Sequence, residues 1–310
     1  MGKYIIKRIL IVFPTLLAII FIVFGIMNLT PGDPAQAMLG QHATPEAVEE
    51  LNRELGFDQP FLVRYGDYVL KLFKGEMGTS YVTGRSVFQE IISRFPTTAI
   101  LATFGMMLSV MIGIPLGILA AVKQYSVYDI IGTSVAMFMA SMPAFWFGLM
   151  AILFFALKLR LLPSVGSDTW VHYILPVTTM ALPVSATILR LTRTTMLETI
   201  RQDYVRTARA KGQTETKVMI NHALKNAILP VITAVGMDFG WLLGGAVVIE
   251  TVFSINGVGK LIIDAIRMKD IPLVTGCALF LAFFFMIVML IVDILYANID
   301  HRIMDRYQNS

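Results

Sequence analysis

The stretch TAILATFGMMLSVMIGIPLGILAAV, residues 98–122, contains no charged side chain and decides the fold. A helix that crosses a membrane needs about 20 consecutive apolar residues, and this stretch is long enough. Five more apolar stretches of comparable length follow or precede it, at 9–29, 129–157, 173–192, 228–252 and 273–297. The sequence therefore predicts an all-α, polytopic membrane protein with six transmembrane helices.

The composition of the chain agrees with this fold class. Hydrophobic residues make up 56% of the 310 residues and charged residues only 15%, whereas a soluble domain is typically about a quarter charged. Mean hydropathy is +0.71. Cys277 is the only cysteine and lies in an apolar stretch, so a disulfide within the chain is excluded.

The first apolar stretch, 9–29, follows basic residues and could be a signal peptide. A cleaved signal has an apolar core of about 7–15 residues and a cleavage site flanked by small residues. The stretch is longer than that, and the IMNLTPGDP sequence after it offers no such site. We therefore expect a retained membrane anchor.

Lysine and arginine indicate the orientation, because they are commoner in cytoplasmic than in external connections. With the N-terminus in the cytoplasm, the short outside loops hold few of them, namely Lys158, Arg160, Lys260, Arg267 and Lys269. The inside segments then hold many more: Lys3, Lys7, Arg8, Lys123, Arg190, Arg193, Arg201, Arg206, Arg209, Lys211, Lys217, Lys225, Arg302 and Arg306. We therefore expect both termini in the cytoplasm, with 30–97 as a long external loop between the first and second spans.

The 30–97 loop contains helical patterns. Thr44 is a typical N-cap and Pro45 a typical first helical residue, so a helix is expected from there to Gly56. Apolar residues at helical spacing predict two more helices, at 61–73 and 86–95. Their apolar stripes could lie on the membrane surface or against another subunit, or could pack on one another.

The fifth apolar stretch carries glycines at every fourth residue, which makes a flat stripe where another helix can approach closely. These helix-packing glycines are Gly236, Gly240 and Gly244. Prolines in the third and fourth stretches break backbone hydrogen bonds and permit kinks. They are Pro143, Pro176 and Pro183.

Asp238, Trp241 and Gly245 lie on roughly the opposite face of the same helix, at 100° per residue. A carboxylate at this depth costs several kcal/mol if it faces lipid. We therefore expect this face to line a water-filled translocation pathway or to meet a partner helix. A structural hydrogen bond of Asp238 inside the helix bundle is the alternative.

The sequence offers no signal for covalent chemistry. NGVGKL at 256–261 departs from a phosphate-binding loop because Ser254 and Leu261 stand where Gly and Ser or Thr are needed, so it is interpreted as a turn. The histidines, scattered over different loops with no cysteine at ligand spacing, predict no metal site; they are His42, His172, His222 and His301. We expect no catalytic residues, no cofactor and no nucleic-acid partner, since the orientation rule explains the basic residues.

The segment RTARAKGQTETK, 206–217, is polar and lies between two apolar stretches. Ala208 and Ala210 followed by Gly212 predict a slim helix with an abrupt end, because Gly readily takes the left-handed conformation. Such a helix can seat in a groove of another protein, whose carboxylates the arginines would pair with. The alternative is a basic anchor loop with no partner.

This segment resembles the cytoplasmic coupling loop of inner-membrane permeases of binding-protein-dependent ABC transporters. That loop has the general form Glu-Ala-Ala, three residues, Gly, nine residues, then Ile-x-Leu-Pro. Aligned on Gly212, the chain keeps Ala208 and Leu224. It departs where other residues replace the Glu, the first Ala, the Ile and the Pro, at Arg206, Thr207, His222 and Lys225.

These departures are similar to the peptide and nickel branch of the family, whose loops read like RTARAKG followed by HALKNAILP. The early PGDPA with a long external loop resembles the first of the two permeases of that branch. Further segments look like the same branch: LGFDQPFLVRY at 55–65, GEMGTS at 75–80, SMPAFW at 141–146, LLPSVG at 161–166, HYILP at 172–176 and LLGGAVVIETVF at 242–253.

The resemblance implies a single permease transmembrane domain over 1–310, with 193–227 as its cytoplasmic coupling loop. It implies a heterodimer with a second related permease, two cytoplasmic ATPases that hydrolyse ATP, and an external substrate-binding protein, all at the bacterial inner membrane. The chain itself would be non-catalytic. The residues implied in ATPase coupling are Arg206, Thr207, Ala208, Arg209, Ala210, Lys211 and Gly212.

Three functions are weighed on this basis. The first is ATP-driven uptake of di- or oligopeptides or a peptide-like solute such as glutathione, and nickel or metal-chelate uptake by the same machinery is the near alternative. A transporter driven by an ion gradient is a remote alternative, because such proteins often show repeated halves that this sequence lacks. An intramembrane enzyme would need a catalytic pair that the sequence does not show.

Overall fold

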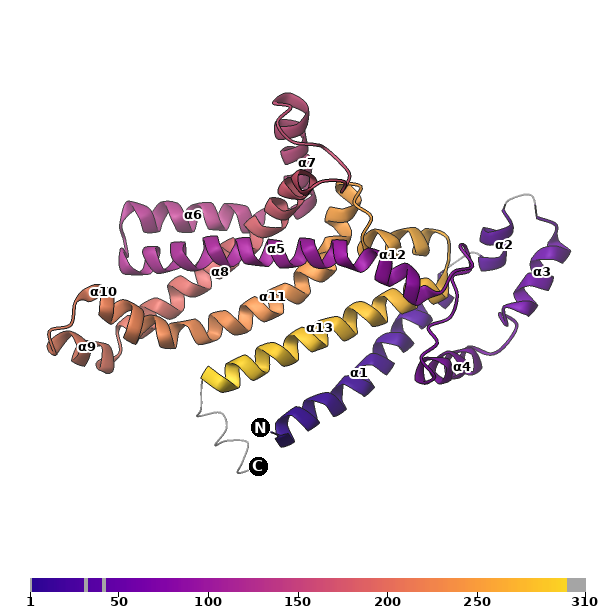
Figure 1. The fold of residues 1–310 in the computed structure, drawn as a ribbon, viewed down its shortest axis with the longest axis horizontal. Coiled ribbons are helices and arrows are strands. Elements are labelled where there is room, and N and C mark those ends of the chain that lie inside the picture. The colour runs from indigo at the N-terminus through magenta and orange to yellow at the C-terminus, as the bar shows by residue number, and fades with distance from the viewer. Residues whose placement is uncertain (1, 31–32, 41–42, 300–310) are drawn as a thin grey trace. The chain divides into compact units, whose positions relative to one another are not determined.

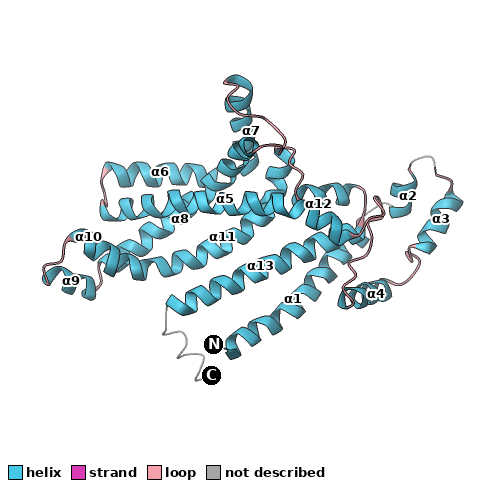
Figure 2. Cartoon of the chain, in the orientation of Figure 1, coloured by secondary structure: helices cyan, strands magenta, loops and turns pink. Residues whose placement is uncertain are grey.

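A computed structural model describes residues 2–30, 33–40 and 43–299 of the chain, and within these ranges it consists of helices joined by loops, without a β-sheet (Figures 1 and 2). Some sequence predictions lie outside the described residues, namely those on Pro31–Gly32, His42, His301, Arg302 and Arg306. The all-α prediction is confirmed.

Five helical stretches are long and apolar enough to cross a membrane: Leu10–Leu29, Val87–Val122, Trp170–Ile200, Glu215–Val252 and Ile271–Val292. The first two belong to α1 (Gly2–Leu29) and α5 (Val87–Val122), and the last belongs to α13 (Ile271–Ile299). The third comprises η2 (Trp170–Tyr173) and α8 (Ile174–Ile200). The fourth runs from α10 (Glu215–Val218) through η3 (Met219–Leu224) to the end of α11 (Lys225–Val252). A sixth candidate is the bent pair Val127–Ser141 and Ala144–Lys158. The described residues thus hold five to six candidate spans.

The expected straight span at 129–157 is divided at Pro143. Here α6 (Val127–Ser141) ends, and α7 (Ala144–Ala151) with the π-helical η1 (Ile152–Lys158) continues at an angle of 100°. Met142 takes an extended conformation, φ −85° and ψ 134°, because a proline disfavours helical geometry in the residue before it. The predicted kink at Pro143 is confirmed, whereas Pro183 lies inside α8 without ending it.

The chain forms two compact units, described here one at a time. The first comprises Met1–Thr98 and Asn256–Met286, and the second comprises Ala99–Ile255 and Ile287–Ser310. The first unit contains α1, α2 (Pro34–Leu39), α3 (Pro45–Glu54), α4 (Phe61–Phe73) and α12 (Val258–Arg267). The second contains α6 to α11, with α9 (Asp203–Ala210), α10 (Glu215–Val218), the π-helical η3 (Met219–Leu224) and α11 (Lys225–Val252).

Two predicted helices of the 30–97 loop are confirmed. Thr44 caps α3 by accepting a hydrogen bond from the backbone N–H of Ala47 at 3.4 Å, and Gly56 beyond its end has φ +75°. Helix α4 covers the predicted 61–73. The separate helix at 86–95 is wrong, because α5 continues from Val87 through Pro96 into the membrane stretch, which membrane helices tolerate when neighbours satisfy the freed carbonyl.

The first unit has an apolar core built around α1, α5, α12 and α13. Its buried members include Phe24, Ile91, Val258, Leu261 and Cys277. The apolar spacing of Val258, Leu261 and Ala265 explains why α12 begins within NGVGKL, where a turn was predicted for the whole motif. Only Asn256 and Gly257 precede the helix.

Asp270 joins the loop after α4 to the start of α13. Its buried carboxylate accepts hydrogen bonds from the hydroxyl of Ser80 and from the backbone N–H groups of Tyr81 (3.2 Å) and Leu273 (3.3 Å). The chain around 80–83 is thereby held on α13.

The second unit packs α6 and α11 against α8. Asp129 of α6 accepts two hydrogen bonds from Arg193 of α8, Nε to Oδ1 at 2.5 Å and Nη2 to Oδ2 at 2.8 Å. The Asp129 side chain is only 4% exposed. This bidentate pair fixes the start of α6 on the far end of α8.

Candidate functional site

Helix α9 has a buried face and an exposed face. Val205 and Ala208, one turn apart, are buried in a cluster with Met196 of α8 and with Met219 and Ala223 of η3. Because α10, η3 and α11 follow one another without a break, α9 lies on the beginning of a continuous helical stretch, Glu215–Val252. Figure 1 shows α9 and α10 at the end where α8 and α11 meet.

Polar contacts hold the loop between α9 and η3. Arg209 donates two hydrogen bonds to Glu215, Nε to Oε2 at 3.1 Å and Nη2 to Oε1 at 2.7 Å, which raises the pKa of Arg209. The ring of His222 and the amide oxygen of Gln213 are 3.0 Å apart. The loop is therefore preorganised although it is exposed.

The predicted end of α9 is confirmed. Lys211 caps the helix and Gly212 follows with φ +74°, its N–H donating to the carbonyl of Arg209 at 2.9 Å. A Cβ added at Gly212 would meet no atom of the described residues within 4 Å. The site next to Gly212 is thus open space that another protein can occupy.

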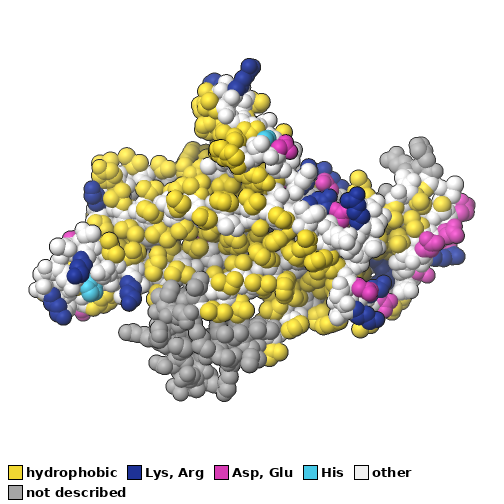
Figure 3. Space-filling model, viewed as in Figure 1, with side chains coloured by type: hydrophobic (Ala, Val, Ile, Leu, Met, Phe, Trp, Pro, Cys, Tyr) yellow, Lys and Arg dark blue, Asp and Glu magenta, His cyan; other side chains and the backbone are white. Residues whose placement is uncertain are grey.

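The structure divides the residues expected in ATPase coupling into two groups. Ala208 faces the core, so it holds α9 in place instead of presenting itself to a partner. Arg209 is committed to Glu215. The exposed members are Arg206, Thr207, Ala210, Lys211 and Gly212. Figure 3 shows Lys and Arg side chains gathered over α9 and α10, beside a mostly hydrophobic surface over α5, α6 and α8.

The residues expected to line a pathway are only partly brought together. Trp241 and Gly245 are neighbours, since a Cβ on Gly245 would lie 3.6 Å from the indole ring, and both line an apolar hollow of about 170 Å³ with Ala144 and Phe145 of α7. Trp241 is 58% exposed. Asp238 does not line this hollow, and its Oδ2 atom is buried without a hydrogen-bond partner among the described residues.

The glycine stripe of α11 behaves unevenly. A Cβ on Gly236 would lie 2.6 Å from Cγ2 of Val292 in α13, so another helix does approach there. Gly240 is half-buried, and Gly244 has nothing within 4 Å. Among the described residues, another helix approaches the stripe closely at Gly236 and not at Gly244.

Sequence reasoning missed a second pair of packing glycines. Cβ atoms on Gly113 and Gly117 of α5 would lie 2.8 Å from Ile188 and 2.7 Å from Thr192 of α8. Their spacing of four inside an apolar stretch is the signal that could have found them.

Two family models match the chain. Residues 113–305 match the binding-protein-dependent transport system inner membrane component, and residues 1–102 match the N-terminal part of the membrane component of the same transport systems. Together they cover nearly all of the sequence. Members of this family work in ABC transporters with ATPase subunits and a binding protein.

Curated relatives agree with the family match. The glutathione transport system permease protein GsiC of Escherichia coli, of Salmonella typhi and of Pectobacterium atrosepticum are each 40% identical over 300 residues, covering 97% of this chain and 98% of the relative. These relatives belong to the peptide and nickel branch, as first permeases. The resemblance stated from the sequence is thereby confirmed.

Solved structures share the fold of the chain. The inward-facing MetNI methionine ABC transporter in its native crystal form matches with a TM-score of 0.57 at 15% identity, covering 69% of this chain and 97% of that chain. An amino acid ABC transporter crystallised with histidines matches with a TM-score of 0.52 at 16% identity, covering 69% and 94%. At these identities the match speaks for the fold alone.

Family membership also agrees with the expectation of a non-catalytic subunit, because members of this family are membrane components without catalysis of their own. The chain belongs to the binding-protein-dependent transport system inner membrane component family, and it is a multi-pass permease subunit of an ABC importer in the bacterial inner membrane.

Proposed function

We propose that this permease subunit imports di- or oligopeptides or a peptide-like solute such as glutathione. It works as a heterodimer with a second related permease, with two cytoplasmic ATPases and with an external binding protein. Residues 1–310 form one transmembrane domain with six spans and both termini in the cytoplasm. The support for the substrate class is the 40% identity to permeases named for glutathione transport.

The observation that carries the coupling role is the open space at Gly212, beside the exposed side of α9. Basic and small residues surround this space, while Val205 and Ala208 anchor the opposite side of α9 to α8 and η3. A helix with one side packed against the rest of its unit and the other side exposed can transmit a displacement that a partner protein imposes on it. ATP-driven closure of the two ATPases would impose that displacement.

We infer that the displacement is transmitted along one continuous helical stretch, Glu215–Val252. Helix α9 packs on η3, and η3 leads directly into α11, which carries Asp238 and Trp241. A displacement at α9 would therefore reach Asp238 and Trp241 through a helical stretch that has no intervening loop, although Pro230 removes one backbone donor from it. The ion pair of Asp129 and Arg193 ties α8 to the start of α6.

Asp238, Trp241 and Gly245 remain the proposed pathway face. The Oδ2 atom of Asp238 is buried without a partner among the described residues, and it could accept a hydrogen bond from water, or from the amino group of a peptide once a movement of the helices exposes it. The exposed Trp241 ring offers an apolar surface for side chains. If Asp238→Asn and Trp241→Ala both leave uptake rate and substrate preference unchanged, this face does not line the path.

The experiment is an uptake assay in a strain that lacks the chain and is complemented with it. Labelled glutathione, a dipeptide and Ni²⁺ are each supplied with and without competitors, and the ATPase is inactivated in parallel. We expect ATP-dependent uptake of a peptide-like solute. Uptake of Ni²⁺ alone would show that the substrate is a metal ion and not a peptide-like solute. Uptake that persists without ATPase activity but stops when the ion gradient is removed would contradict coupling to ATP hydrolysis.

A further inference from the structure

Helix α4 presents three faces. Phe61 and Tyr65 pack against the first unit's core, and Arg64, Asp67 and Lys71 form a polar strip on one flank. The remaining side is apolar and exposed. Its members are Leu62 (69% exposed), Val63, Leu70 (61%) and Phe73 (70%). Soluble helices bury their apolar residues, so an exposed apolar side requires a partner.

The inward face of α4 shows how deep this helix lies. The hydroxyl of Tyr65 donates to the backbone carbonyl of Leu17 in α1 at 3.1 Å. Phe61 and Tyr65 also contact the rings of Phe21 and Phe24, with centroids 5.2 to 6.3 Å apart. All of these α1 residues lie inside its apolar stretch, Leu10–Leu29.

The depth follows from helix geometry. At 1.5 Å per residue, Phe24 lies about 8 Å and Leu17 about 18 Å from Leu29 along α1. The apolar stretch of 20 residues is itself about 30 Å long, the thickness of the hydrocarbon layer. Helix α4 therefore contacts α1 between about 8 and 18 Å from the end of its apolar stretch, a range that extends to about the middle of the hydrocarbon layer.

Arg64, in the polar strip of α4, reaches toward the end of the apolar stretch of α1 instead of toward its middle. The Arg64 guanidinium passes over the rings of Phe24 (5.5 Å) and Phe57 (4.4 Å) and donates to the side-chain oxygen of Asn28 at 3.0 Å, near the end of the apolar stretch. Long basic side chains reach toward the membrane surface in this way. Its partial burial lowers the pKa of Arg64.

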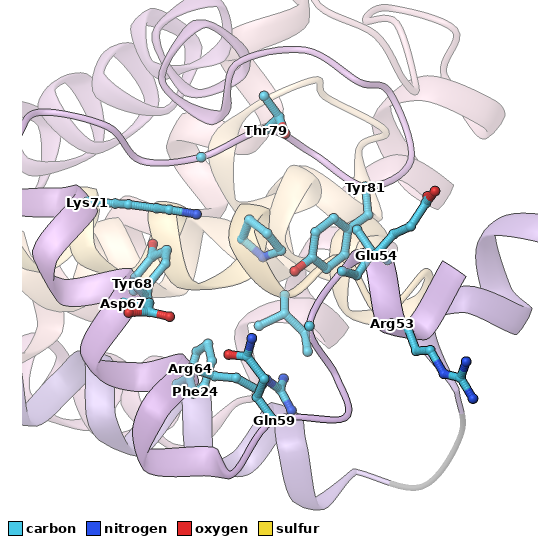
Figure 4. Close-up of a pocket in the computed structure, with 15 residues that line it drawn as sticks. Phe24, Arg53, Glu54, Gln59, Arg64, Asp67, Tyr68, Lys71, Thr79 and Tyr81 are labelled. Atoms are coloured by element: carbon cyan, nitrogen blue, oxygen red, sulfur yellow. The ribbon is translucent and has the colours of Figure 1, made fainter. Parts of the chain in front are cut away.

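The same strip lines a polar hollow of about 430 Å³. Figure 4 shows Arg64, Asp67 and Lys71 of α4 around this hollow, opposite Tyr81 and Glu54. Water or polar solute can fill the hollow, while the apolar side of α4 faces away from it. A helix with charged groups on one flank and apolar groups on the other is typical of a membrane interface.

We propose that α4 is an interfacial helix in the outer leaflet of the bilayer, with Leu62, Leu70 and Phe73 in contact with lipid acyl chains. The occupant of its apolar side is lipid because α1, in the same part of its apolar stretch, exposes Ile22 (57%) and Ile26 (59%). The choice of leaflet rests on the proposed orientation of the N-terminus. The lipid contact itself does not, so the two can fail separately.

The test uses spin labels on the assembled transporter in lipid nanodiscs. Leu62→Cys, Leu70→Cys and Phe73→Cys report on the apolar side, and Lys71→Cys, on the polar flank of the same helix, is the matched control. Cys277 is buried, so the unsubstituted chain sets the labelling background. Collision rates with oxygen, which concentrates in lipid, and with a water-soluble chromium complex are measured at each site.

We expect the oxygen-to-chromium ratio to be several-fold higher at Leu70 and Phe73 than at Lys71. Chromium access at Leu70 and Phe73 equal to that at Lys71 would show that the apolar side faces water, and would overturn the proposal. Labels that neither reagent reaches would show a protein cover, and would overturn it in favour of a second subunit on this face.

Discussion

Replacing Gly212 by aspartate separates a docking surface from a simple anchor loop. Its φ of +74° favours glycine, and a side chain there meets nothing within the chain. Alanine in this conformation costs about 1–2 kcal/mol, whereas Asn and Asp adopt it more readily. Gly212→Asn therefore adds bulk with little strain, and Gly212→Asp has the same shape and adds a charge.

The expected magnitude follows from where the charge is placed. If Gly212 seats in a groove of the ATPase, the new carboxylate is buried without a designed partner, at a cost of several kcal/mol. A loss of about 3 kcal/mol corresponds to roughly hundredfold weaker association. We expect Gly212→Asp to abolish ATP-driven uptake at normal protein level, and Gly212→Asn to reduce it less.

Gly75 provides the matched control. It follows the cap residue Lys74 of α4 as Gly212 follows Lys211 of α9, with φ +82°, an N–H bond of 2.9 Å to Leu72 and no atom within 4 Å of an added Cβ. The assay compares ATPase subunits retained on the tagged permease with uptake per molecule. Equal retention and uptake for Gly212→Asp and Gly75→Asp would refute the coupling role, whereas retained ATPases without uptake would place the defect in transmission of motion.

Three further predictions concern the packing that supports this site. Gly236→Ala should cost about 1–3 kcal/mol of stability, since its Cβ would lie 2.6 Å from Val292. Gly244→Ala is the control and should be neutral. Equal melting temperatures of the two variants in detergent would contradict this prediction. Arg193→Ala should cost about 3–5 kcal/mol, because it leaves buried Asp129 unpaired, and replacing both residues by apolar ones should recover much of the loss in the same assay. Asp270→Ala should lose about 1–3 kcal/mol for each orphaned donor and release the chain near Ser80 to protease, and resistance equal to wild type would show that the carboxylate does not hold this loop.

Local chemistry made several helices predictable from the sequence. The bounds of α4 follow from apolar spacing, and Thr44, Gly56 and Gly212 end or begin helices through their own backbone preferences. The bend at Pro143 follows from the residue before a proline. Such features depend on a few neighbouring residues, so a sequence shows them directly.

Other features depend on contacts between residues that are far apart in the sequence. The sequence alone did not show that α5 continues past Pro96, because a proline more often marks a helix boundary than a position inside a helix. Ala208, expected among the coupling residues, is buried, and its spacing from Val205 is the signal of an inward face. Likewise, the closeness of Gly113 and Gly117 to α8 needs the position of α8 itself.

The most direct test of the coupling site is a photo-cross-link from Ala210, an exposed residue of α9 whose side chain is small enough to replace. The reactive amino acid is introduced there in the intact transporter in native membranes, and the cross-linked partner is identified by mass spectrometry. The account predicts a covalent adduct with an ATP-binding subunit, in a yield that changes with bound nucleotide. Adducts with lipid alone, from a complex that still contains its ATPases, would contradict it.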